Sequence, residues 1–432
     1  DGRFVAFVVA AGGDMLGVWR VFDVGSGELL PLEVPALAYT GGMPGWLPDG
    51  TAFLLADRTE EGCHRIRLVA VVDGPGRTMP DAVFTHEQVP PTVPGLSPHV
   101  SPGGRWALAV GQPHEHIALM LGDLETGEWR RFQPEGWHAE CDGVWLDDET
   151  YVARSHHAAP RGRVVAIPAV TSTDPSTWRE IAPESDAVLR GVTVVVVRVV
   201  LCEIKDVSVR FRLLHLDGTP DRILPLDGPG TSRVAFVIRR FDRSEELTLD
   251  YETFVRAGTL YHYDVGGGRL TVLGEPGEEL QGITVSQRFA VSTDGTQVPF
   301  FVIHRADLDL SAPQPALVNG YGGFNVALLP TYLRQMAPFV RAGGIFVQAN
   351  LRGGAEYGAE WHDAGRLLHK QNTFDDLFAV AESVVASGLS TPERMAMMGG
   401  SNGGLLAGVA IVQRPDLWRV VAALVPIFDQ LE

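Results

Sequence analysis

The chain has 432 residues, of which 45% are hydrophobic and 20% charged; this length predicts two or three domains, and the composition excludes a disordered or collagen-like protein. Asp and Glu number 53 against 35 Lys and Arg, and the formal net charge of −18 argues against nucleic acid or an anionic membrane surface as the main partner. The three cysteines, Cys63, Cys141 and Cys202, form no CxxC pair, which disfavours a disulfide framework and favours a reducing compartment.

The first two thirds of the chain consist of short β-type segments separated by Gly, Pro and Asp. Four of them have strand length and are rich in β-branched or aromatic residues: residues 4–10, 52–56, 106–110 and 192–197. The most apolar stretch, residues 192–201, is about half as long as a membrane span and contains an arginine, so it does not predict one.

A glycine-containing turn sequence recurs before these strands. Gly2, Gly50 and Gly104 lie 48 and 54 residues apart, which is about the length of one four-stranded propeller blade. Residues 147–150 lead into another strand in the same manner. Because a β-sandwich would show turns every 8–12 residues, the spacing favours a β-propeller over residues 1–281.

From about Ile283 onward, strands alternate with helical segments, the pattern of a parallel α/β sheet. One helix is predicted over residues 374–387, with Asp375 and Asp376 in its first turn, where carboxylates favour the helix dipole. The predicted strands are residues 299–304, 315–318, 344–349, 394–398 and 420–427. We therefore expect a second domain over residues 282–432.

A GxSxG motif is centred on Ser401, between a predicted strand and the apolar residues 405–411. In an α/β-hydrolase such a serine sits at a tight strand–turn–helix elbow, where the following helix N-terminus favours an oxyanion. The motif predicts Ser401 as a nucleophile and the backbone N–H of Asn402 as an oxyanion donor. The glycine-rich turn at residues 319–325 is either a second donor or a structural turn with a packed Tyr321. It does not fit GxGxxG, which disfavours nucleotide binding.

The C-terminal part resembles prolyl oligopeptidases, serine peptidases in which a seven-bladed β-propeller caps an α/β-hydrolase domain. The propeller part resembles them more loosely, at residues 173–178 and 258–264. The motifs that carry the stronger resemblance are residues 320–325, 350–358, 361–362, 370–372, 374–376, 399–404 and 413–417.

The resemblance implies a role for each matching residue. Ser401 would be the nucleophile, and the Tyr321 hydroxyl and the Asn402 N–H would form the oxyanion hole. Phe324 and Ile427 would line the pocket for the substrate proline. The implied activity is hydrolysis of short peptides on the carboxyl side of proline, by a cytoplasmic monomer that uses neither a metal nor an organic cofactor.

Arg352 and Glu356 resemble a structural ion pair behind the site, with a solvated charge pair as the alternative. The sequence HEH at residues 114–116 is not HExxH, so a metal site there is disfavoured. His362 and His369 lie near the motifs, where packing is the favoured interpretation.

The resemblance also exposes a departure from the family pattern. The family's catalytic aspartate and histidine both follow the serine, whereas here 31 residues follow Ser401 and all 13 histidines precede it. We therefore expect a fragment truncated at both ends, with about six of seven blades and no activity alone. Two alternatives stay open. One is a propeller-based binding module with a vestigial hydrolase remnant, and the other is a related oligopeptidase with dibasic or acylaminoacyl specificity.

Overall fold

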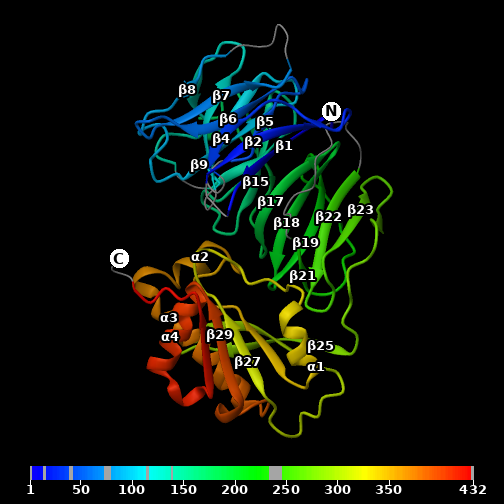
Figure 1. Cartoon of the computed structure of the whole chain (residues 1–432), viewed down its shortest axis with the longest axis vertical. Helices are drawn as coiled ribbons and strands as arrows, with labels where there is room; N and C mark the ends of the chain where they lie inside the picture. Colours follow the sequence, from blue (N-terminus) through cyan, green and yellow to red (C-terminus); the bar gives the residue numbers. More distant parts are fainter. Residues whose placement is uncertain are drawn as a thin grey trace.

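The computed structural model of the chain describes residues 2–12, 16–37, 42–72, 79–112, 116–137, 140–232 and 246–429. Within these residues the strands form six antiparallel four-stranded sheets and, after them, one six-stranded sheet. Figure 1 shows the small sheets in the upper part of the molecule, and the large sheet with its helices in the lower part. The predicted division between residues 281 and 282 falls between the last small sheet and the large one.

The six small sheets follow one another along the chain. The first three contain β1 (Phe4–Ala10), β2 (Leu16–Asp23), β3 (Glu28–Leu29) and β4 (Val34–Leu37); β5 (Gly45–Trp46), β6 (Ala52–Arg58), β7 (His64–Ala70) and β8 (Ala82–Val83); and β9 (Gly95–Val100), β10 (Trp106–Gln112), β11 (Ala118–Asp123) and β12 (Trp129–Arg131). The next three contain β13 (Cys141–Trp145), β14 (Thr150–Ser155), β15 (Arg163–Pro168) and β16 (Arg179–Ala182); β17 (Val188–Val195), β18 (Arg198–Lys205), β19 (Ser208–His215) and β20 (Pro220–Ile223); and β21 (Gly230–Thr231), β22 (Glu246–Thr253), β23 (Thr259–Asp264) and β24 (Arg269–Val272).

Each small sheet packs face to face against the next. Separate apolar clusters join the first sheet to the second, the second to the third, and so on to the sixth. Their largest side chains include Phe53, Trp145, Tyr151 and Phe211, each at most 2% exposed. The first strands of neighbouring sheets also lie side by side, β5 against β9, β9 against β13 and β13 against β17. This radial packing confirms the predicted β-propeller and excludes the sandwich.

The recurring glycine-containing turn sequence occurs once in each of three sheets. Gly2, Gly50 and Gly104 have φ values of 76°, 70° and 76°, a left-handed conformation that glycine adopts without strain. They precede β1, β6 and β10, which belong to three consecutive sheets. The predicted strand 192–197 ends at Val195, because the chain turns there and pairs back on itself, with Val195 opposite Arg198. The most apolar stretch of the sequence is therefore a hairpin.

The large sheet has the order β25-β26-β28-β27-β29-β30. β25 and β26 pair antiparallel, β26 pairs antiparallel with β28, and the remaining pairs are parallel, which is the α/β-hydrolase arrangement expected. Its elements are β25 (Ile283–Val291), β26 (Gln297–Arg305), β27 (Ala316–Gly320), α1 (Ala337–Arg341), β28 (Ile345–Ala349), α2 (Ala359–Asp363), α3 (Gln371–Ala386), β29 (Met395–Gly400), α4 (Asn402–Gln413) and β30 (Val420–Leu424). Short 3₁₀ helices cover Pro175–Thr177, Arg334–Met336, Leu367–His369, Pro392–Arg394 and Pro415–Leu417.

Two predicted boundaries in this part are wrong. α3 begins at Gln371, three residues earlier than predicted, so Asp375 and Asp376 lie in its second turn and not in its first. Asp376 is fully buried and serves an ion pair instead of the helix dipole. β30 ends at Leu424, so Ile427 lies beyond the strand.

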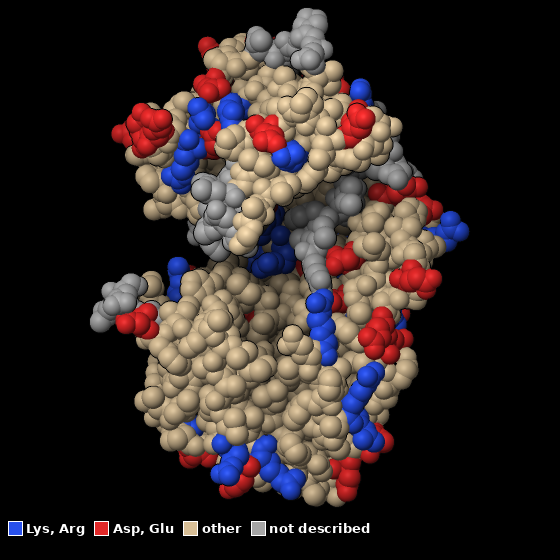
Figure 2. Space-filling model, viewed as in Figure 1, with Lys and Arg blue, Asp and Glu red and all other residues tan. Residues whose placement is uncertain are grey.

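The upper and lower parts share an apolar cluster. Val207 and Phe254 of the propeller pack there with Phe301, Ile303 and Leu333 of the hydrolase part. In the space-filling view the surface is hollowed between the two parts (Figure 2). The shared cluster therefore joins the parts next to an open hollow.

The structure bears on two further features of the sequence. All three cysteines are free, and Cys141 and Cys202 are buried. No helix in the described part of the chain combines the length and apolarity needed to cross a bilayer.

Candidate active site

The candidate site lies at the carboxyl edge of the parallel strands. β27 and β29 are adjacent, and Tyr321 and Ser401 directly follow their last residues. β30 lies on the other side of β29, and Ile427 follows its end by three residues. Because parallel strands point their carboxyl ends to one edge, residues 80 or more positions apart in the sequence meet there, as is usual for sites in such sheets.

Ser401 occupies a strained turn between β29 and α4. Its φ and ψ are 55° and −117°, a backbone conformation that residues other than glycine rarely adopt. The turn is tight enough to exclude side chains at Gly399 and Gly403, since a Cβ on Gly399 would lie 2.1 Å from the Gly403 carbonyl oxygen. A Cβ on Gly403 would lie 2.7 Å from the carbonyl oxygen of Gly320. This is the strand–turn–helix geometry in which strain exposes a nucleophile.

The first turn of α4 directs backbone N–H groups toward the serine. The Ser401 carbonyl accepts hydrogen bonds from the Gly404 N–H at 2.9 Å and the Leu405 N–H at 3.2 Å. The N–H of Asn402 belongs to the first helical residues, which have no acceptor within their own helix. It is therefore placed to donate to a negative charge that develops next to Ser401, where the helix dipole also helps.

The Tyr321 turn is held against this helix terminus. The Asn402 side chain donates from Nδ2 to the Tyr321 carbonyl oxygen at 2.6 Å. A Cβ on Gly403 would lie 3.8 Å from Cδ2 of Tyr321, so the tyrosine ring lies beside the first turn of α4. Two residues before Tyr321, at the end of β27, Asn319 donates from Nδ2 to the Met398 carbonyl oxygen of β29 at 2.9 Å. The structure thus brings Ser401, Asn402 and Tyr321 together.

The two residues expected to line a proline pocket lie at the same sheet edge. Phe324 is on the Tyr321 turn, in a left-handed conformation with φ of 55°, and it is 61% exposed. Ile427 follows β30 and is half-buried. Both side chains leave apolar surface exposed at this edge of the sheet, and their role in binding stays a prediction.

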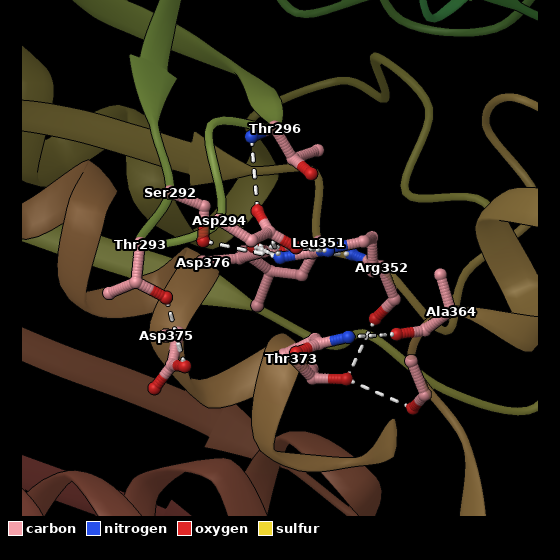
Figure 3. A network of polar contacts seen from close by, with 12 residues as sticks. Ser292, Thr293, Asp294, Thr296, Leu351, Arg352, Ala364, Thr373, Asp375 and Asp376 are labelled. Carbon is pink, nitrogen blue, oxygen red and sulfur yellow. Dashed lines mark hydrogen bonds and ion pairs between the residues drawn. The ribbon is translucent and has the colours of Figure 1, made fainter.

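A buried ion-pair network underlies the site (Figure 3). Arg352, which follows β28, donates to the buried Asp376 of α3 from Nη2 at 2.6 Å, from Nε at 2.9 Å and from its backbone N–H at 3.1 Å. It also donates to Asp294 and, at 3.2 Å, to the Ser292 hydroxyl. Burial opposes the charge of Arg352, but the hydrogen bonds with Asp376 and Asp294 raise its pKa. The hydrogen bond with Arg352 lowers the pKa of Asp294 to about 2.

The expected pair between Arg352 and Glu356 is therefore wrong. Glu356 is 2% exposed, and its Oε1 accepts from the Leu328 N–H at 2.9 Å and from Asn350 Nδ2 at 3.2 Å. Burial raises the pKa of this carboxyl group. The two motif residues are four positions apart, but Arg352 pairs instead with Asp376, which is distant in sequence.

Other candidate groups are accounted for separately. In the part of the chain that the structure describes, Ser401 Oγ makes no hydrogen bond, and no three His, Cys, Asp or Glu side chains are grouped to hold a metal. His114 and Glu115 lie outside the described residues, and His116 contacts Asp142 at 3.4 Å. His362 bonds through Nδ1 to the Gly353 carbonyl oxygen at 2.7 Å, a packing role as expected.

Sequence reasoning assigned no role to Lys370. Its Nζ donates to the Gly322 carbonyl oxygen at 2.6 Å, within the Tyr321 turn. A signal was available, because this is one of only two lysines in a chain with 33 arginines, and it falls inside a matching motif.

Taken together, a strained serine turn at the end of parallel strands in a mixed sheet and a β-propeller above that sheet define the class of propeller-capped α/β-hydrolases. The sequence model of the prolyl oligopeptidase N-terminal β-propeller domain matches residues 1–276, and that of the prolyl oligopeptidase family matches residues 330–432. The chain belongs to the prolyl oligopeptidase family.

Individual relatives agree with this assignment. The prolyl endopeptidase of Elizabethkingia miricola is 29% identical over 298 residues, which cover 68% of this chain and 42% of the relative. An uncharacterized peptidase of Sinorhizobium fredii, y4nA, is 37% identical over 193 residues, covering 44% of this chain and 27% of the relative. A solved structure from a study of two prolyl endopeptidases has a TM-score of 0.86 at 32% identity, covering 99% of this chain and 64% of the solved one. The matched segments thus cover less than half the length of these two curated relatives.

Proposed function

We propose that the protein to which this chain belongs is a serine endopeptidase that cleaves short peptides on the carboxyl side of proline. The observation that carries the proposal is the strained Ser401 elbow, with the Tyr321 turn bound to it through Asn402. The relatives named prolyl endopeptidase support the same activity. Neither a metal nor an organic cofactor takes part in the proposed reaction.

The proposed reaction runs through an acyl-enzyme. Ser401 Oγ attacks the carbonyl carbon of the substrate proline, while the family's histidine base, oriented by an aspartate, takes the hydroxyl proton. The Tyr321 hydroxyl and the Asn402 N–H stabilise the oxyanion, because both residues lie next to the Ser401 turn. The carbon–nitrogen bond then breaks, the amine leaves with the proton from the histidine, and water hydrolyses the ester.

In this proposal, the hollow between the propeller and the hydrolase part and the apolar side chains at the same sheet edge as Ser401 select the substrate. Phe324 would pack on the proline ring, and Ile427 would close the other side of the pocket. The position of the hydrolase edge below the propeller favours short peptides over folded proteins. We further propose that the protein acts as a cytoplasmic monomer.

The test compares proline and arginine substrates on the full-length product of the gene. Peptidyl-Gly-Pro and peptidyl-Gly-Arg amidomethylcoumarins of equal length are offered to the wild type and to Ser401→Ala. Faster cleavage of the proline substrate, lost in Ser401→Ala, supports the proposal. Faster cleavage of the arginine substrate would assign the protein to another specificity. Equal release by wild type and Ser401→Ala would leave the propeller-based binding module as the better interpretation.

A further inference from the structure

Two consecutive carbonyl groups of the Tyr321 turn are each held by a side chain from outside the turn. The Tyr321 carbonyl oxygen accepts from Asn402 Nδ2, and the Gly322 carbonyl oxygen accepts from Lys370 Nζ, both at 2.6 Å. The turn is unusual in its backbone, because Gly322, Phe324 and Asn325 all have φ values between 55° and 61°. The left-handed conformation is costly at the two non-glycine residues, Phe324 and Asn325, so the shape of the turn depends on external contacts.

Lys370 reaches this turn from the residue that precedes α3. Its side chain is half-buried, and Nζ lies 5.8 Å from the centre of the Phe374 ring. Within the described residues it forms no ion pair with a carboxylate, and the Gly322 carbonyl oxygen is its hydrogen-bond acceptor. Burial lowers the pKa of this amine to about 8. An ammonium group is expensive to bury without a counter-charge, so its position calls for a functional explanation.

The chemistry of lysine fits this contact better than that of arginine. The chain contains 33 arginines and 2 lysines, so a basic residue with no special requirement would be expected to be arginine. The other lysine, Lys205, forms an exposed ion pair with Asp186. A compact ammonium suits a single carbonyl acceptor, whereas a planar guanidinium suits the bidentate contacts that Arg352 makes.

We propose that Lys370 is a positioning residue for the oxyanion hole: its ammonium fixes the peptide plane after Gly322, next to the plane that Asn402 holds, and thereby helps to set the direction of the tyrosine hydroxyl. This inference rests on the proposed function, because it assigns the hydroxyl to the oxyanion. The Asn402 bond restrains one end of the same short segment, and the Lys370 bond restrains the next peptide. Losing the second restraint should mainly affect the transition state, in which the oxyanion develops.

The contact also makes the turn sensitive to alkaline pH. The elements around Lys370 carry several titratable groups: Tyr321 on the turn, the neighbouring His369 in the chain, Asp375 in α3, and the mutually paired Arg352 and Asp376. As the pH rises through about 8, the amine loses its proton and the bond to Gly322 loses its charge assistance. Turnover of the wild type should therefore decline in this range, and a permanently charged residue at this position should remove the decline.

The experiment uses Lys370→Met, Lys370→Arg and the control Lys205→Met in the full-length protein. With a proline substrate at pH 7, we expect kcat of Lys370→Met to fall about tenfold with KM within about twofold, and Lys205→Met to match the wild type. A peptide aldehyde, which loads the oxyanion hole, should bind Lys370→Met more weakly by a similar factor, while the matching peptide alcohol should bind as before. Lys370→Arg should recover part of kcat and lack the decline near pH 8.

The outcomes separate this inference from the proposed function. An active wild type with Lys370→Met unchanged in kcat and in aldehyde affinity overturns the role of Lys370 and leaves the peptidase assignment intact. Should Lys370→Met fail to fold, as judged by circular dichroism, the pH profile of Lys370→Arg decides, and a decline identical to that of the wild type overturns the inference. A wild type no more active than Ser401→Ala overturns both.

Discussion

The Arg352 network offers a stability prediction that can be worked out from its contacts. Asp376 is fully buried and accepts bonds from the backbone N–H, Nε and Nη2 of Arg352, and Arg352 is 4% exposed. Asp376→Asn keeps the shape of the side chain but removes its charge, leaving a buried guanidinium with Asp294 as its remaining carboxylate partner. Removing one partner of a buried pair costs about 3–5 kcal/mol. For a domain of 150–250 residues this corresponds to a melting temperature lower by about 6–20 °C.

The neighbouring residue provides the matched control. Asp375 lies on the same helix turn but is only half-buried, and it accepts bonds from Gln371 Nε2 at 2.8 Å and the Thr293 hydroxyl at 3.2 Å. Asp375→Asn should therefore cost about 1 kcal/mol or less. Both variants are measured by calorimetry at pH 7. If Asp376→Asn melts no lower than Asp375→Asn, the buried pair does not stabilise the fold as argued. A double variant, Arg352→Met with Asp376→Leu, should recover most of the loss.

Three further predictions concern the elbow, acid stability and thiol reactivity. Gly403→Ala should abolish peptidase activity in the full-length protein, because its Cβ would lie 2.7 Å from a backbone oxygen. Gly400→Ala should retain most of the activity in the same assay, because its Cβ would meet nothing closer than 3.8 Å. The carboxylate of Asp294 has a lowered pKa of about 2, so its stabilisation is present above about pH 4 and lost toward pH 2. The difference in unfolding free energy between wild type and Asp294→Asn should shrink over that range in urea titrations, and a constant difference would contradict this. The half-buried Cys63 should react with a thiol reagent in the native state. Cys202 is buried, and burial raises its pKa to about 12, so it should react only after unfolding. Labelling of the native and the unfolded protein, followed by peptide mapping, tests this difference.

Local sequence determined much of the fold because its signals depend on neighbouring residues. A glycine-containing turn sequence that recurs about every 50 residues predicted successive sheets, since left-handed turns favour glycine wherever they occur. The small residues around Ser401 predicted a tight turn for the same reason. Boundaries were less certain, because the hairpin at Val195 and the start of α3 depend on pairing and packing with distant segments.

Tertiary structure alone decided which groups meet at the site. Arg352 was expected to pair with the nearby Glu356, but the sheet and α3 bring Asp376 and Asp294 to it instead. Lys370 lies 48 residues from the carbonyl oxygen that it contacts. Charge and hydrogen-bonding capacity can be read from the sequence, but each such group has many possible partners, and only the folded backbone brings one of them within bonding distance. The sequence by itself thus determined the elements and the nucleophile candidate, and the fold decided the partners that hold them in place.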